Sequence, residues 1–268
     1  MISNSEGKPL RLLMIGDIVG RSGRRAVKET IPLLQKEGDF DFVIANGENA
    51  AGGLGITRKV ADELFSCNVD VITTGNHVWS KKEIHSFISR EERLIRPANF
   101  PPGVPGVGGN VFLTKNNLKI AVINLAGRTF MPALDCPFRK ADELVLKLSG
   151  LTKLIVVDFH AEATSEKVAL GWHLAGLVSA VCGTHTHVQT ADERILYGGT
   201  AYISDVGMTG PRDSVIGVKK ELAIEKFLSQ VPKKFEVATG SYQFNAVTIE
   251  IDPQTGKAQL IKRIQNYE

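Results

Sequence analysis

Cysteine is scarce in this sequence, and its few positions form no motif. Cys67, Cys136 and Cys182 are odd in number and lack the spacing of a paired set. This pattern argues against a disulfide framework and favours the reducing cytoplasm. Because buried cysteine usually behaves as a small apolar residue, we do not expect these thiols to bind a metal.

Long apolar runs are missing as well. No stretch reaches the roughly 18–20 apolar residues that a membrane helix needs, so we expect no membrane partner. Residues 1–9 are polar and lack the apolar core of a signal peptide, and we expect them to form a flexible tail. The net charge is only +3, and lysine and arginine are spread along the chain. This distribution does not favour a nucleic-acid partner and is compatible with an anionic substrate.

What the sequence does contain is a series of short apolar runs separated by helix-like segments. The runs are nearly continuous in apolar residues rather than alternating, as in strands that are covered on both faces. We predict strands over 10–15, 42–45, 69–73, 120–125, 154–157, 177–181 and 201–204. Apolar residues at helical spacing predict helices over 22–37, 57–66, 80–90, 139–149 and 218–229.

Two hairpins complete the pattern. Residues 110–114 and 119–125 flank Asn116-Asn117, and residues 245–251 and 258–264 flank a turn that contains Pro253 and Gly256. The order of strands and helices predicts an α/β fold, a two-sheet sandwich flanked by helices. The length of 268 residues and the lack of a long linker predict a single domain over 1–268.

Polar segments follow several of the predicted strands. They are Gly16-Asp17, Asn46-Gly47-Glu48-Asn49, Gly75-Asn76-His77, Asp158-Phe159-His160 and Gly183-Thr184-His185-Thr186-His187. In open α/β sheets, ligands bind beyond the carboxyl ends of the strands, where all these segments lie. A single histidine is more often a core residue than a ligand, but several such segments at one edge reverse that expectation. His85 and His173 lie in helix-like stretches, and we interpret both as structural.

The donor types indicate two divalent metal ions. Imidazole and oxygen donors without thiolate suit manganese, iron or zinc. Two such ions, balanced by the carboxylates of Asp17 and Glu48 and a bridging hydroxide, would leave a net positive site that favours a phosphate substrate. If the segment around Thr186 is extended, His185 and His187 share one face, whereas a turn would direct them to different metals.

These motifs resemble those of the metallophosphoesterase superfamily, and two departures match its YmdB-like phosphodiesterase branch. Asp17-Ile18-Val19 stands where the superfamily has Asp-x-His, and Glu48 stands in the place of its bridging aspartate. Further marks of the branch are Arg96-Pro97-Ala98-Asn99 and residues 204–211, so the resemblance covers nearly the whole chain. It implies a four-layer αββα fold.

The resemblance also implies a ligand set and a reaction. One metal would be held by Asp17, Glu48, Asn49 and His187, and the other by Glu48, Asn76, His160 and His185. Glu48 would bridge the two ions, for which iron or manganese is favoured and zinc is the alternative. His77 would stay unligated and act as the general acid. The implied reaction is hydrolysis of 2′,3′-cyclic nucleotides to 3′-nucleotides, with a metal-bridging hydroxide as the nucleophile.

Substrate contacts are less clearly marked. Arg128 is a candidate to bind a phosphate oxygen, with an ordinary surface arginine as the alternative. Gly207 and Thr209 could cradle the ligand, although a plain turn over 207–211 explains this glycine-rich stretch nearly as well. We interpret Glu162 and Glu166 as a solvated helix start rather than as support for the metal site.

Two other functions stay open. The same metals could serve a phosphomonoesterase or a nuclease. Alternatively, the protein could be a regulatory module that binds a nucleotide and a partner protein, although such a module needs no proton donor like His77. The oligomeric state is also open, and the 110–125 hairpin could supply an edge for a homo-oligomer.

Overall fold

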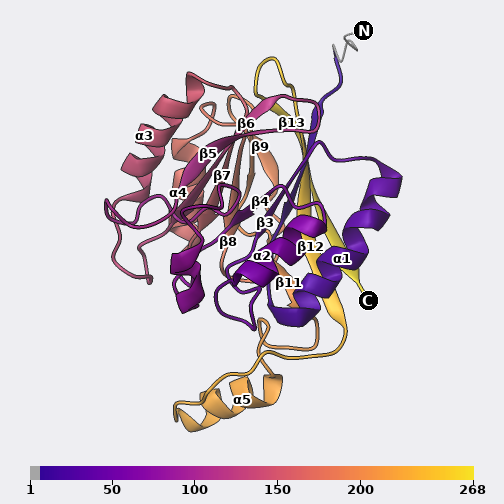
Figure 1. Cartoon of the computed structure of the whole chain (residues 1–268), viewed down its shortest axis with the longest axis vertical. Coiled ribbons are helices and arrows are strands. Elements are labelled where there is room, and N and C mark those ends of the chain that lie inside the picture. The colour runs from indigo at the N-terminus through magenta and orange to yellow at the C-terminus, as the bar shows by residue number, and fades with distance from the viewer. Residues whose placement is uncertain (1–6) are drawn as a thin grey trace.

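Two β-sheets pack face to face between two pairs of helices (Figure 1). The computed structural model describes residues 7–268. Most of the tail predicted over 1–9 therefore lies outside the described residues, and residues 7–9 lead directly into the first strand. None of the helices over 7–268 combines the length and apolar character that a membrane span needs.

The first sheet combines strands from both ends of the chain, in the order β2-β11-β12-β1-β3-β4, with β13 paired to β12. Its strands are β1 (Leu10–Ile15), β2 (Asp17–Ile18), β3 (Phe42–Asn46), β4 (Val71–Thr73), β11 (Met208–Pro211), β12 (Tyr242–Ile251) and β13 (Ala258–Tyr267). Strands β1, β3 and β4 run parallel, whereas β12 is antiparallel to β1. The carboxyl ends of β1, β3 and β4 therefore meet at one edge.

The second sheet has the order β5-β6-β7-β8-β10-β9. Its strands are β5 (Gly109–Leu113), β6 (Lys119–Ala126), β7 (Ile155–His160), β8 (Ala180–Thr184), β9 (Arg194–Leu196) and β10 (Thr200–Ile203). The central strands β6, β7, β8 and β10 are parallel, and the edge strands β5 and β9 pair antiparallel.

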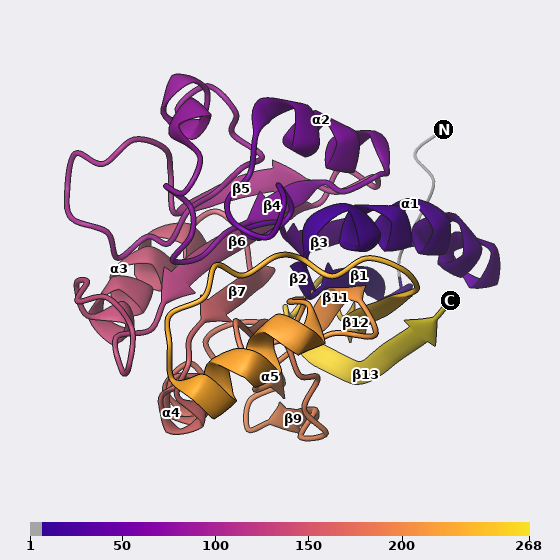
Figure 2. The ribbon, with the colours of Figure 1, turned by 90° about the horizontal axis from the view of Figure 1, so that it is seen from below.

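Helices cover the outer face of each sheet. Helices α1 (Gly20–Glu37) and α2 (Arg58–Ser66) lie on the first sheet, and α3 (Pro137–Ser149) and α4 (Thr164–His173) lie on the second. Helix α5 (Lys220–Ser229) is different, because it lies beyond one end of the sandwich and is nearest to the viewer in Figure 2. The α/β sandwich prediction, with four αββα layers, is confirmed.

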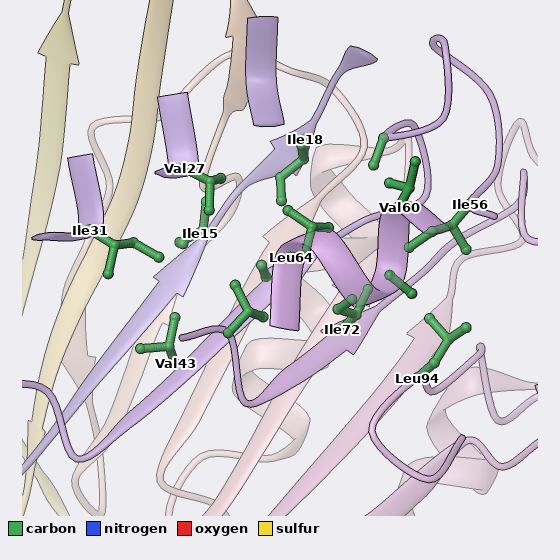
Figure 3. Packing of buried hydrophobic residues seen from close by; sticks show 14 of the residues in the cluster. Ile15, Ile18, Val27, Ile31, Val43, Ile56, Val60, Leu64, Ile72 and Leu94 are labelled. Carbon is green, nitrogen blue, oxygen red and sulfur yellow. The ribbon is translucent and has the colours of Figure 1, made fainter. Parts of the chain in front are cut away.

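Strand alternation explains why the apolar runs are continuous. In β1, Leu13 and Ile15 pack under α1 and α2, whereas Leu12 and Met14 pack between the two sheets. Figure 3 shows the helix side of this arrangement, where Ile15 lies among residues of α1, α2 and β3. Because both faces of each central strand are buried, apolar residues are required at successive positions.

Some local predictions were wrong. Residues 80–90 do not form an α-helix, and the segment contains only a short 3₁₀ helix, η1 (Lys82–Ser86). No side chain caps this helix, because its N-cap residue, Lys81, makes no side-chain hydrogen bond to the backbone. By contrast, Thr57 caps α2 by accepting the Val60 N–H at 3.4 Å. The short strands β2, β9 and β11 were not predicted.

Candidate metal centre

The apolar core between the sheets becomes polar at the carboxyl ends of four strands. In β7, Val156 belongs to this core, and alternation places Asp158 and His160 on the same face. The same step from an apolar to a polar residue occurs in β3, β4 and β8. The four polar residues that result are Asn46, Thr73, Asp158 and Thr184, all buried.

Asp158 ties these strand ends together. Its carboxylate accepts hydrogen bonds from Asn46 Nδ2 at 3.1 Å, from Thr184 Oγ1 at 2.7 Å, and from the Thr73 hydroxyl. Burial raises the pKa of Asp158 to about 6, although the Thr73 hydrogen bond opposes this. The signal that could have identified it is its position two residues before His160 in a strand.

The Asp158 network orients His160. Because the Thr184 hydroxyl donates to Asp158, its oxygen accepts from His160 Nδ1, which lies 2.9 Å away. The Nδ1 proton is then fixed, and Nε2 faces the other polar segments. Such an outer hydrogen bond commonly sets the tautomer of a metal-binding histidine.

Four donor atoms converge at His160 Nε2. This nitrogen lies 3.0 Å from Asn76 Oδ1, 3.0 Å from His185 Nδ1 and 3.2 Å from Glu48 Oε1. Donors bound about 2.0–2.2 Å from one ion, at right angles to each other, would be about 3 Å apart. Glu48, His160 and His185 form a group that could hold a metal ion. The spacing therefore allows these donors to bind one ion together.

The electrostatics of this group favour a cation. Burial would lower the pKa of His160, but Glu48 and Asp17 outweigh burial and raise it to about 9. Burial likewise opposes ionisation of Glu48, yet His160 and His77 hold the pKa of Glu48 well below its usual range. Burial and neighbouring His160 lower the pKa of His185 to about 3, so its imidazole is in the neutral form that binds metals.

A second group of donors surrounds Asp17. This carboxylate is fully buried, and Oδ2 accepts the His185 N–H at 3.0 Å while Oδ1 has no hydrogen-bond partner within 7–268. His187 Nε2 lies 3.9 Å from that unpaired oxygen. A buried carboxylate oxygen without a partner is costly, and a cation between Asp17 and His187 would satisfy it.

Asn49 lies between this group and His77. Its Nδ2 atom is 3.0 Å from Glu48 Oε1 and 3.3 Å from His187 Nε2, and its Oδ1 atom is 2.9 Å from His77 Nδ1. In this orientation the oxygen contacts His77, so a role for Asn49 as a metal ligand stays a prediction. A half turn of the amide would exchange its oxygen and nitrogen with little change in shape.

The loop after β8 turns sharply and separates its two histidines. His185 and His187 have φ values of 101° and 67°, so the segment is not extended. His185 consequently points to His160 and Glu48, and His187 points to Asp17. Of the two arrangements left open by the sequence, the turn is the one observed. Buried Asp205 holds the turn by accepting both the N–H and the hydroxyl of Thr186, at 3.0 and 2.7 Å.

Glu162 supports the site, contrary to our interpretation from the sequence. Its Oε2 atom lies 3.0 Å from His185 Nε2, so this ring nitrogen is occupied and Nδ1 is left for the donor cluster. Glu166 has a different role, because it accepts the backbone N–H groups of Arg128 and Thr129 at 3.0 and 3.2 Å. Glu162 lies two residues before α4 and Glu166 lies in its first turn, so both fit the pattern of a solvated helix start, which concealed these contacts.

His77 lies at the edge of the cluster. Its Nδ1 atom is 2.9 Å from Asn49 Oδ1 and 3.2 Å from Glu48 Oε1, and about a third of the side chain (34%) is exposed. The glycine before this segment is required, because a Cβ atom on Gly75 would overlap His160 and Glu48. His77 is thus held beside the donors while remaining accessible.

An open cavity of about 470 Å³ adjoins both donor groups. Its lining includes His77, His185 and His187, together with the acidic residues Glu48, Glu162 and Glu236. Among the described residues that line it there is no lysine or arginine. An anion could therefore bind strongly here only if cations occupied the donor groups.

The three predicted substrate contacts do not lie in this cavity. Arg128 is exposed and is absent from the lining. Thr209 is buried in β11 and its hydroxyl donates to the Asn245 carbonyl at 3.0 Å, so the predicted turn is a strand. Gly207 is buried, and its carbonyl accepts the Asp17 N–H at 2.9 Å. Thr209 and Gly207 therefore support the sheet and Asp17 rather than lining the cavity.

The two histidines interpreted as structural lie apart from the donors. His85 stacks on Trp79 with ring centroids 5.0 Å apart. His173 Nε2 lies 2.7 Å from Asp142 Oδ1 on the outer side of the second sheet.

Comparisons with known proteins agree with this architecture. A family model described as YmdB-like protein matches residues 13–264. A 2′,3′-cyclic-nucleotide 2′-phosphodiesterase of Bacillus subtilis (strain 168) is 54% identical over 255 residues, which cover 95% of this chain and 96% of the relative.

Two crystal structures are also similar. One, described as a novel phosphatase from Mycoplasma pneumoniae, has a TM-score of 0.91 and 37% identity, covering 97% of this chain and 94% of the other. The second, from Thermus thermophilus and described only as a hypothetical protein, has a TM-score of 0.89 and 40% identity, covering 96% of this chain and 99% of the other. The chain therefore belongs to the YmdB-like protein family.

Proposed function

We propose that this protein is a metal-dependent phosphodiesterase that hydrolyses 2′,3′-cyclic nucleotides to 3′-nucleotides. The observation that carries the proposal is the convergence of Glu48, His160 and His185, with Asp17 and His187 as a second donor group, beside a cavity whose described lining offers no lysine or arginine. The B. subtilis relative, a 2′,3′-cyclic-nucleotide 2′-phosphodiesterase, supports the reaction and the substrate class.

The residues fit two divalent cations. Asp17, Glu48, Asn49 and His187 would hold one, and Glu48, Asn76, His160 and His185 would hold the other. Iron and manganese suit this mixture of imidazole and oxygen donors, and zinc is the alternative. When bound, the ions supply an activated water and hold the phosphate oxygens. Asp17, Glu48 and His160 are fully buried, so these three donors have little contact with bulk solvent.

His77 is the proposed general acid. Its Nδ1 atom is engaged by Asn49 Oδ1 and Glu48 Oε1, which fixes the ring and leaves Nε2 for proton transfer. A proton from Nε2 would neutralise the departing 2′ oxygen as its bond to phosphorus breaks. A positioned general acid typically contributes about 10²–10⁴ in rate.

Steady-state assays would test the proposed reaction. Metal-free protein, reloaded separately with Fe²⁺, Mn²⁺ or Zn²⁺, should hydrolyse 2′,3′-cyclic AMP and release 3′-AMP. A higher kcat/KM for 3′-AMP itself would indicate a phosphomonoesterase instead, and a preference for single-stranded RNA would indicate a nuclease. If no reloaded form hydrolyses any of these, the regulatory alternative becomes the better explanation.

We further propose that residues 1–268 act as one domain, because donors from residue 17 to residue 187 build one site. We also propose that the protein acts in the cytoplasm, where its three free thiols would stay reduced. A homo-oligomer stays a prediction, which light scattering of the purified protein would check.

A further inference from the structure

The cavity has a second side that the proposed chemistry does not use. Whereas the donor groups are polar, this side consists of apolar side chains. We call it the apolar wall. Its members are Leu54, Ile216, Val218, Phe235 and Val237. Three of these are substantially exposed, with Ile216 at 53%, Leu54 at 49% and Phe235 at 42%. Large apolar residues exposed together at the mouth of a cavity are typical of a ligand site.

Backbone pairing and side-chain packing hold the apolar wall in place. The two segments that flank α5 pair through a bridge between Val218 and Val237. Backbone hydrogen bonds of 2.9 Å from Lys219 to Glu236 and from Ala238 to Gly217 extend this pairing. Val237 also packs closely against the protein body, since a Cβ atom on Gly53 would clash with it.

Ile216 joins the wall to the donor groups. Its backbone has φ of 47°, which is strained for a β-branched residue. In this conformation its carbonyl accepts the His187 Nδ1 hydrogen at 2.8 Å, while its side chain remains exposed at the cavity. This hydrogen bond ties the wall to His187, which would hold one of the proposed metals.

Polar groups that could read the edges of a base are scarce on this side. Glu236 lies between the wall residues Phe235 and Val237, and its carboxylate forms an ion pair with Lys219. Lys226 Nζ lies over the ring of Phe235, 4.7 Å from its centroid, and this cation–π contact restrains the ring. An apolar surface with a restrained aromatic ring can bind a planar group by stacking, which every base offers.

We propose that the apolar wall binds the nucleobase of the substrate, mainly by stacking on Phe235. The identity of the substrate rests on the proposed function. The wall selects for the presence and area of a base rather than for its hydrogen-bonding pattern, so purine nucleotides bind more tightly than pyrimidine nucleotides.

Binding of adenosine to the full chain would test the wall without requiring metals or turnover. The affinity, measured by NMR titration, should fall roughly tenfold in Phe235→Ala and be largely retained in Phe235→Trp. Phe227→Ala is the matched control, because Phe227 is 72% exposed on α5 and does not line the cavity. Equal adenosine affinities in wild type and Phe235→Ala would overturn the proposal.

A kinetic comparison separates this inference from the proposed function. The ratio of kcat/KM for 2′,3′-cyclic AMP to that for 1-O-methylribose 2′,3′-cyclic phosphate, which has no base, should fall about tenfold in Phe235→Ala. In Phe227→Ala the ratio should keep its wild-type value. If wild type hydrolyses neither compound, the proposed function fails, while the adenosine titration still decides whether the wall binds a base.

Discussion

The buried ion pair between Lys167 and Asp205 should be essential to the stability of the metal-binding loop. Lys167 Nζ in α4 lies 2.6 Å from Asp205 Oδ2, and the two side chains are 3% and 1% exposed. The same carboxylate oxygen holds the backbone and hydroxyl of Thr186, between the two histidines of the turn. Removing either charge should therefore weaken both the fold and the donor arrangement.

Lys167→Met and Asp205→Ala should lower the free energy of unfolding by different amounts. Loss of one partner from a buried pair destabilises by about 3–5 kcal/mol, because it leaves the other charge uncompensated. In Lys167→Met, Asp205 keeps donors from Thr186 and from the Gly207 N–H at 2.8 Å, so we expect a loss of about 3 kcal/mol. Asp205→Ala leaves a buried ammonium and also frees Thr186, so we expect about 5 kcal/mol.

Urea denaturation of metal-free protein measures this difference directly. Lys140→Met is a matched control, since Lys140 pairs with Glu143 on an exposed part of α3. The control should change the free energy of unfolding by less than about 1 kcal/mol. Because Thr186 positions both imidazoles, bound metal per chain should also fall in Lys167→Met. Two results would contradict this role of the ion pair: a loss of unfolding free energy in Lys167→Met no larger than in the control, or a smaller loss in Asp205→Ala than in Lys167→Met.

The remaining predictions concern the donor cluster. Gly75→Ala should abolish metal binding in elemental analysis, because the new methyl group would overlap His160 and Glu48; full metal occupancy would contradict this steric argument. His77→Ala should lower kcat by about 10²–10⁴ with metal content intact, and unchanged turnover would remove His77 from the role of general acid. Thr184→Val should weaken metal affinity by about 10- to 100-fold in competition with a chelator, since it breaks the link from Asp158 to His160. Chelation of the metals should lower the melting temperature measured by calorimetry, and adding Mn²⁺ should restore it, because the ions bind only the folded site.

Much of the fold could be predicted because strand patterns are local. The continuous apolar runs reflect burial on both faces, and the polar residues that interrupt them mark the strand ends. Errors arose where neighbouring elements overrode the local pattern. Residues 80–90 contain apolar residues at helical spacing but begin without a side-chain cap, and they form only η1. Met208–Pro211 forms a strand because β2 and β12 offer it partners that lie far away in the sequence.

The sequence was sufficient for the chemical character of the site. Imidazole, carboxylate and amide groups at strand ends are visible as short motifs, and parallel strands necessarily bring their carboxyl ends to one edge. Which of these groups contact one another depends on how distant segments of the chain pack together. The turn that separates His185 from His187, the contact of Glu162 with His185, and the Lys167–Asp205 pair all require folded neighbours.

The apolar wall depends even more on folding. Leu54 and Phe235 are widely separated along the chain, and each is individually an ordinary exposed apolar residue. They share a surface only because the segments that flank α5 return to the cavity beside the donor groups. Local patterns encode which chemical groups a strand end presents, whereas long-range packing sets which of these groups meet and which surfaces adjoin them.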